Sequence, residues 1–347
     1  MKKNTNLFNF KYNLHIFLII LIILSIIYLF YSYFHHRSIN IHIESFENPI
    51  NFYYKQKPII WMDPNKQKPI ISMNPNKPII WMNPNKPIIW MYWETLPGKK
   101  KPGYIDLCYN SVLHNCSKCF DIKYLNEKNI QQYIPEISDY NISQLKIQHK
   151  ADVYRYLLLN KYGGLWVDAD ILVLKCLCKY YKNLDNHDYV GFGCGYSKKS
   201  CSQSLYGYGS PLNWMMGAKP NSKFLKCIVS NVDKRLKNGN SIQYHEIGKD
   251  ILRKCHNDLK ENENWSYYHV PSKCNEYDNW GNKLNNIFKN IDNSKCENER
   301  YFYPFYNTAP GYPQWFKDLT AEQIMEYDLP IRPIIKEAFS ANTGCNS

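Results

Sequence analysis

The chain has 347 residues, enough for one large catalytic domain with appendages or for two small domains. Its formal net charge is +13, but the lysines are scattered, and the densest run, Lys99 to Lys101, is only three residues long. This dispersion argues against nucleic acid as a partner, because nucleic-acid-binding domains gather their basic residues on one face.

The amino-terminal region predicts a membrane anchor. Residues 12–36 contain no Asp, Glu, Lys or Arg, and residues 14–34 are almost continuously apolar, which suits a transmembrane helix. A cleaved signal peptide would have a shorter apolar core followed by small residues. Lysines precede the span, so we expect residues 1–13 to form a cytosolic tail and the bulk of the chain to lie in a lumen, as a type II protein.

The cysteines and sequons agree with an oxidising, lumenal location. The chain has 12 cysteines, an even number that fits several disulfides of open connectivity. Cys116 and Cys119 form a CxxC pair without a second pair at zinc-finger spacing, which favours structural thiols or disulfides over zinc or redox chemistry. Three sequons, at Asn115, Asn141 and Asn264, offer glycosylation sites.

Residues 35–86 read as a stem that carries a short repeat of the form PIIWMNPNK. Its period of about nine is too short for helical solenoid units. Each Pro-Asn predicts a turn, and each Ile-Ile-Trp-Met predicts an extended piece. We interpret the last copy as the first strand of a catalytic domain, residues 87–347, and the earlier copies as duplications; a Trp-bearing stalk that packs on a partner is the alternative.

Residues 87–147 alternate between strand and helix signals. The apolar run at 87–93 predicts a buried strand, a helix is expected at about 104–115, and 121–125 reads as a second strand. Residues 126–129 read as the entry to another helix. This alternation predicts an α/β fold.

Residues 147–170 carry the most informative pattern. A helical spacing runs from Ile147 to Lys161, and a neighbouring face of that helix carries Asp152, Arg155 and Tyr156. Gly163 and Gly164 follow at the position of a left-handed cap, and 165–167 predicts a buried strand.

Asp168 and Asp170 end that strand, and strand alternation points both carboxylates to one side. Ligands bind at the carboxyl ends of strands in open α/β sheets. Two carboxylates there make a half-site for Mg²⁺ or Mn²⁺, whose remaining positions phosphate oxygens fill.

The whole pattern, from Asp152 through the two glycines to Asp170, resembles the DxD glycosyltransferases of the capsular-polysaccharide-synthesis and initiating α-mannosyltransferase type. Residues 86–112 resemble the opening of that family, 121–129 its second strand, and 213–218 a segment downstream of the DxD. The resemblance implies a GT-A-like, Rossmann-type mixed sheet flanked by helices.

The resemblance also implies the site. Trp90 is expected to stack on the nucleotide base, with Trp93 as its fallback, and Asp152 and Arg155 to bind the ribose or donor sugar. Asp168 and Asp170 are expected to hold the metal and the diphosphate and, with Arg155, to form the catalytic set. Tyr156 and Gly164 are counted among the donor-binding residues, although both glycines of the pair also serve the turn.

The implied reaction moves a sugar, of hexosyltransferase type and with retention, from a UDP- or GDP-sugar to a glycan, glycoprotein or glycolipid acceptor in a compartment like the Golgi or ER. One departure from the family stands out, because no His follows Phe302-Tyr-Pro304 and the nearest are His245 and His269. An inactive, membrane-tethered glycan-binding protein is therefore one alternative. A phosphohydrolase is another, because residues 165–170 resemble the first motif of the haloacid dehalogenases, whose Gly-Asp-x-x-x-Asp cluster is absent here.

Overall fold

A computed structural model describes residues 83, 86–140, 142–193, 211–239, 241–262, 267–270, 287–288, 301–305 and 312–340. The chain divides into two compact units, 1–70 and 71–347, and all of these residues belong to the second. Among them, no helix combines the length and apolar character that crossing a membrane requires. The predicted anchor at 14–34 and nearly all of the stem lie outside the described residues.

Six of the described strands form one mixed sheet in the order β2-β1-β3-β6-β5-β7. Their bounds are β1 Ile88–Tyr92, β2 Asp121–Leu125, β3 Gly164–Val167, β5 Tyr189–Gly193, β6 Pro211–Ala218 and β7 Tyr267–Val270. β1 runs parallel to β2 and β3, and β5 runs parallel to β7, whereas β6 is antiparallel to both β3 and β5. The expected mixed α/β sheet is therefore present.

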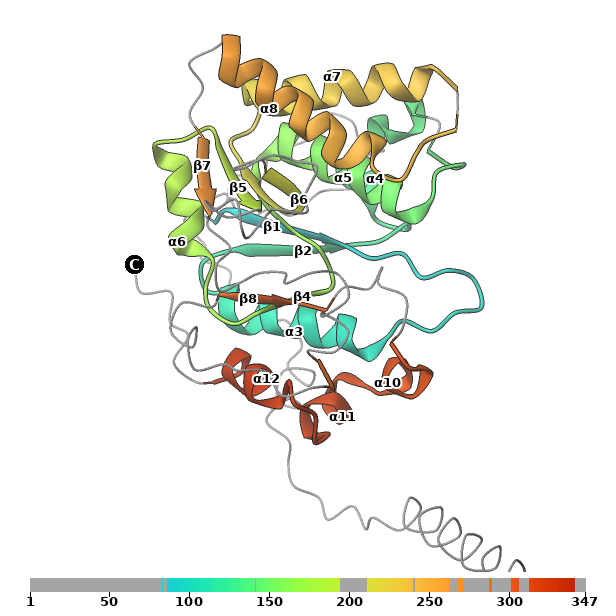
Figure 1. Cartoon of the computed structure of the whole chain (residues 1–347), viewed down its shortest axis with the longest axis vertical. Coiled ribbons are helices and arrows are strands. Elements are labelled where there is room, and N and C mark those ends of the chain that lie inside the picture. Colours follow the sequence, from blue (N-terminus) through green and yellow to red (C-terminus); the bar gives the residue numbers. More distant parts are fainter. Residues whose placement is uncertain are drawn as a thin grey trace, which may run out of the picture. The chain divides into compact units, whose positions relative to one another are not determined.

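β1 is buried along its whole length because both faces of the sheet are covered. Ile88, Trp90 and Tyr92 pack into a core with α5 (Ile147–Tyr162), α7 (Lys223–Lys237) and α8 (Ile251–Asn262). Ile89 and Met91 face the opposite core, with α3 (Gly103–Cys116) and α6 (Cys178–Tyr181). Figure 1 shows α5, α7 and α8 on one side of the sheet and α3 on the other.

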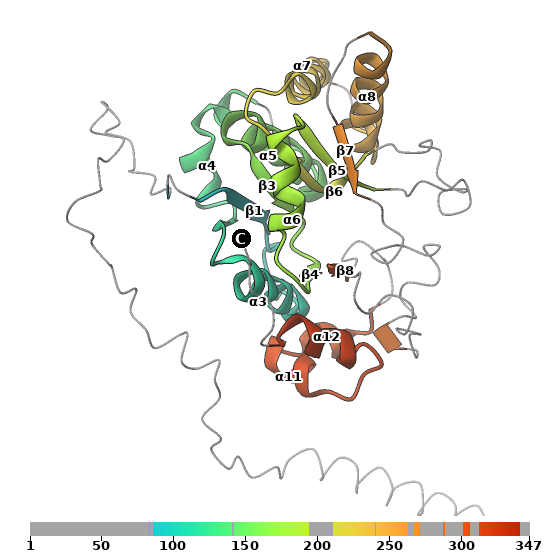
Figure 2. The ribbon, with the colours of Figure 1, turned by 90° about the vertical axis from the view of Figure 1, so that its left-hand side faces the viewer.

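A second, two-stranded sheet packs against α3. β4 (Ile171–Val173) pairs antiparallel with β8 (Phe302–Pro304), and a third core joins this pair and α3 to three short helices. These helices are α10 (Gln314–Asp318), α11 (Ala321–Glu326) and α12 (Arg332–Ala338), and Figure 2 shows α11 and α12 against α3. A capping box between Thr320 and Gln323 starts α11.

The remaining described elements are short. They are α4 (Ile130–Tyr133), the 3-10 helices η1 (Pro135–Asp139) and η2 (Lys182–Asp185), and the π-helical turn η3 (Glu246–Asp250) that precedes α8. The expected helix entry at 126–129 is a turn, and the helix itself begins at Ile130.

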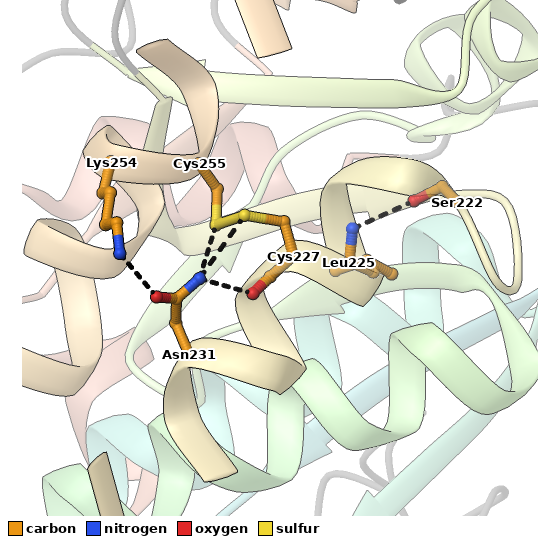
Figure 3. The surroundings of a disulfide bond; sticks show 6 residues. All are labelled: Ser222, Leu225, Cys227, Asn231, Lys254 and Cys255. Carbon is orange, nitrogen blue, oxygen red and sulfur yellow. Dashed lines mark hydrogen bonds between the residues drawn. A yellow bond between two sulfur atoms is a disulfide. The ribbon is translucent and has the colours of Figure 1, made fainter. Parts of the chain in front are cut away.

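A disulfide between Cys227 and Cys255 joins α7 to α8 (Figure 3). Beside it, Asn231 Nδ2 donates to the carbonyl oxygen of Cys227 at 2.9 Å, and Lys254 Nζ donates to Asn231 Oδ1 at 2.8 Å. Cys119 is also disulfide-bonded, whereas burial raises the pKa of the Cys116 thiol to about 12. The CxxC pair is therefore structural, as its lone occurrence predicted.

The prediction of a glycosylation site at Asn115 is wrong for the folded chain. Asn115 is 2% exposed, and its Nδ2 donates to the carbonyl oxygens of Ser111, Val173 and Ala338 at 2.8–2.9 Å. This amide joins α3 to β4 and α12, so its nitrogen is inaccessible to a modifying enzyme. Asn141 and Asn264 lie outside the described residues.

Candidate active site

A pocket of about 360 Å³ opens where β1 and β3 end, a size that suits a small-molecule ligand. Three segments line it: the loop after β1, the first half of α5, and the turn between β3 and β4. The lining residues are Tyr92, Trp93, Glu94, Thr95, Leu96, Lys99, Lys100, Ile147, Gln148, Ala151, Arg155, Trp166, Asp168, Ala169 and Asp170. Three of the predicted residues, Arg155, Asp168 and Asp170, therefore meet in one pocket.

Asp168 and Asp170 lie on a turn that is fixed at both ends. The backbone nitrogen of Asp168 donates to Trp214 O of β6 at 2.9 Å, and Ile171 N donates back to Asp168 O at 3.1 Å. The carbonyl oxygen of Asp170 accepts from Phe305 N at 2.7 Å. β3 ends at Val167, so strand alternation is not what brings the two carboxylates together. A turn between the two sheets does so, with both side chains in the pocket wall.

Arg155 fixes the orientation of Asp168. Its Nη2 lies 3.1 Å from Asp168 Oδ1 and 3.4 Å from Asp152 Oδ1, and its Nη1 donates to the carbonyl oxygen of Asn213. The guanidinium carbon lies 5.0 Å from the ring centre of Trp166, and Trp166 Nε1 donates to Asp168 Oδ1 at 2.6 Å. One oxygen of Asp168 is thus held by two donors, and among the described residues the other accepts no hydrogen bond.

Several carboxylates surround the buried guanidinium of Arg155. Burial raises the pKa of Asp152 to about 6 against the lowering effect of Arg155, and burial also raises the pKa of Asp168. Burial by itself lowers the pKa of Arg155, but Asp168 and Asp152 outweigh it and leave that pKa raised. With Asp170, three carboxylates face one guanidinium, so a cation entering the pocket would be stabilised.

Asp152 does not line the pocket, which corrects its expected contact with ribose or sugar. It is 5% exposed, and its Oδ1 accepts from Asn213 Nδ2 at 2.7 Å in addition to the Arg155 ion pair. Gly248 covers its other oxygen so closely that a Cβ there would lie 3.1 Å from Asp152 Oδ2. Asp152 therefore positions Arg155 from behind the wall.

The structure also corrects the predicted stacking of Trp90 on the nucleotide base. It is fully buried, its Nε1 donates to Gly163 O at 2.9 Å, and its ring packs against Tyr133 and Tyr162 at 5.4 Å. An aromatic ring committed to the core cannot stack on a nucleotide base. Trp93 does line the pocket, and its Nε1 donates to Thr95 Oγ1 at 3.0 Å.

Tyr156 and Gly164 have structural positions rather than donor contacts. Tyr156 is fully buried and lies outside the pocket lining. Gly164 has φ 100°, and a Cβ on it would lie 2.4 Å from Ile88 O, so only glycine lets β3 approach β1 here. Gly163 caps α5 with φ 68° and ψ -161°, so the predicted left-handed cap is correct in its positive φ but not in its ψ.

One pair in the pocket wall was missed by sequence reasoning. Glu94, directly after β1, accepts from Tyr92 OH and from Lys150 Nζ, both at 2.8 Å. Burial and the Glu94 carboxylate raise the pKa of Tyr92. The only sequence signal was the place of Glu94 at the end of an apolar strand. His245 is exposed on a different loop and does not line the pocket, and the side chain of His269 lies outside the described residues.

The donor set of the pocket fits a hard divalent cation. Mg²⁺ and Mn²⁺ sites use one or two protein carboxylates and leave other positions to substrate phosphates. Asp168 and Asp170 provide that pair. Elsewhere in the described part of the chain, three sulfurs lie within 4.8 Å of one another, those of Cys119, Cys176 and Cys178, but the first two are in disulfides and offer no thiolate.

Comparison with known proteins places this geometry in a family. No curated protein matches the sequence. Among 17 matching chains of solved structures, the PaToxG glycosyltransferase is 14% identical with a TM-score of 0.33, covering 52% of this chain and 72% of its own. The apo-form glycosyltransferase GlyE of Streptococcus pneumoniae TIGR4 is 14% identical with a TM-score of 0.38, covering 74% of this chain and 61% of its own. The family model described as capsular polysaccharide synthesis protein matches residues 32–303, so the chain belongs to that family.

Proposed function

We propose that this chain is a glycosyltransferase that takes a sugar from a nucleotide-sugar with the help of Mn²⁺ or Mg²⁺. The observation that carries the proposal is the turn with Asp168 and Asp170, fixed between two sheets and facing a pocket of ligand size. Membership of a polysaccharide-synthesis family favours sugar transfer over the phosphohydrolase alternative.

In this proposal Asp168 and Asp170 hold the cation and present it to the diphosphate of the donor. When bound, a divalent cation neutralises the charge that develops on the departing nucleoside diphosphate. Arg155 and Trp166 keep Asp168 in one orientation, and Asp152 holds Arg155 in place. Such fixed geometry matters because a preorganised site loses no energy to reorganisation during reaction.

We propose Trp93 in place of Trp90 as the side chain that stacks on the base. Its ring lines the pocket and its indole nitrogen is already held by Thr95. Stacking of a base on an aromatic ring contributes about 1–3 kcal/mol, so Trp93→Ala should weaken nucleotide binding about tenfold. Trp90→Phe is the matched control, because it changes a Trp of the same strand region that is fully buried in the core.

We propose the donor, the reaction type, the acceptor and the membrane topology on the basis of the sequence. The donor is a UDP- or GDP-sugar, transfer is of hexosyltransferase type with retention, and the acceptor is a glycan, glycoprotein or glycolipid. We also propose a type II membrane protein anchored by residues 14–34, with its catalytic domain in a lumen like that of the Golgi or ER. The Cys227–Cys255 disulfide supports an oxidising compartment.

The test is turnover of nucleotide-sugars by the purified full-length protein. We expect release of UDP or GDP that requires Mn²⁺ or Mg²⁺ and is lost in Asp170→Asn, whereas Asp139→Asn, at an exposed site outside the pocket, keeps full activity. Phosphate release from simple phosphoesters would favour the hydrolase instead. Glycan binding without any donor turnover would favour the inactive glycan-binding protein.

A further inference from the structure

The loop after β1 contains a fixed turn that ends in a lysine. Lys99 N donates to Leu96 O at 3.0 Å, and the two residues between them are Pro97 and Gly98, the latter with φ 71°. Proline second and a glycine of positive φ third are the requirements of a type II turn. The backbone position of Lys99 is therefore fixed by this turn and its hydrogen bond.

The two lysines that follow are held by α10 and by α3, respectively. Lys100 Nζ donates to Asp318 O of α10 at 3.3 Å, and Lys101 forms an ion pair with Asp106 in the first turn of α3. These contacts fasten the loop to the third core. The ammonium group of Lys99, in contrast, makes no contact with a carboxylate or carbonyl within the described part of the chain.

Lys99 shares its pocket with Asp168 and Asp170. Of the other charged groups in that wall, Glu94 pairs with Lys150, Arg155 pairs with Asp168, and Lys100 donates to the carbonyl oxygen of Asp318. The pocket thus offers two carboxylates for a cation and one lysine, Lys99, whose ammonium group has no partner among the described residues. A nucleoside diphosphate bound with a divalent cation needs both, because the negative charge of the diphosphate exceeds the positive charge of the metal.

We infer that Lys99 binds the diphosphate of the donor, an inference that rests on the proposed function. It gives a role to a residue of the densest run of basic residues in the sequence, Lys99 to Lys101. It also supplies a positive group to a site whose chain has no His after Pro304. Lys99 then discriminates ligands by their phosphates rather than by base or sugar.

The experiment compares UDP and GDP with uridine and guanosine by calorimetry on the full-length protein in the presence of Mn²⁺. A charge-assisted hydrogen bond to phosphate predicts that Lys99→Met weakens diphosphate binding about tenfold, leaves nucleoside binding unchanged, and that Lys99→Arg retains most of the affinity. The matched control is Lys226→Met, which removes the same charge from an exposed site on α7 outside the pocket.

The outcomes separate this inference from the proposal beneath it. If the wild type binds UDP or GDP and Lys99→Met binds them equally well, Lys99 has no such role and the glycosyltransferase proposal stands. Equal losses for nucleosides and diphosphates would also overturn it, because they indicate a distorted loop. If the wild type binds no nucleoside diphosphate, the inference and the proposed function fail together.

Discussion

Replacing Arg155 by methionine keeps a long unbranched side chain but removes the guanidinium that joins three groups of the site. Asp152 would remain 5% exposed, with Asn213 Nδ2 still donating to its Oδ1, and Asn213 O would lose a donor. Removing one partner of a buried ion pair costs about 3–5 kcal/mol. We expect Arg155→Met to lower the free energy of unfolding by about 3 kcal/mol at pH 7.5. This is the low end of that range, because Asp152 can take up a proton instead of staying charged.

Urea unfolding of the purified protein, followed by circular dichroism, measures this loss. Because Arg155 lowers the pKa of Asp152, its removal should raise that pKa further above about 6, and the loss should shrink at pH 5, where the carboxyl is neutral. A double-mutant cycle with Asp152→Asn should show coupling above about 1 kcal/mol. A loss below about 1 kcal/mol at pH 7.5, or strictly additive effects, would refute the buried ion pair as the organising contact of the site.

Three further predictions concern stability and modification. Burial raises the pKa of Asp152 to about 6, so the contribution of this carboxyl to stability is complete below about pH 4 and is lost as the pH rises through 6. Between pH 4.5 and 7.5, the free energy of unfolding of Asp152→Asn in urea titrations should therefore rise relative to that of the wild type, by about 3 kcal/mol at most. Cys227→Ser with Cys255→Ser opens a bridge spanning 28 residues and should cost roughly 3–4 kcal/mol, and an unchanged urea midpoint would contradict this. Asn115 should carry no glycan when the protein is made in a glycosylating host, whereas mass spectrometry that finds it modified would show that α3 does not pack as described.

Much of the fold could be predicted because its signals are local. The strand at Asp121–Leu125 has the predicted bounds, and the helix predicted from Ile147 ends at Tyr162, one residue before its glycine cap. Apolar periodicity and the glycine pair were sufficient there, since both reflect contacts within one element. The pairing of β4 with β8, which are separated by about 130 residues, left no such local trace.

The site residues that were misplaced share a physical reason. β1 is apolar on both faces, so alternation gave no indication that Trp90 points into the core and that Trp93, beyond the strand end, reaches the pocket. The sequon at Asn115 obeys a rule that ignores burial. Asp152 has the right spacing from Arg155, but only the tertiary packing of Gly248 and Asn213 against it shows that its carboxylate lies outside the pocket wall.

The proposed function requires Asp168 and Asp170 to hold a divalent cation in the pocket after β3. Electron paramagnetic resonance of Mn²⁺, titrated with the protein in the presence of UDP or GDP, tests this without requiring turnover or an acceptor. We expect nucleotide-dependent Mn²⁺ binding by the wild type and by Trp90→Phe, and its loss in Asp170→Asn. Equal Mn²⁺ binding by Asp170→Asn and the wild type would contradict it.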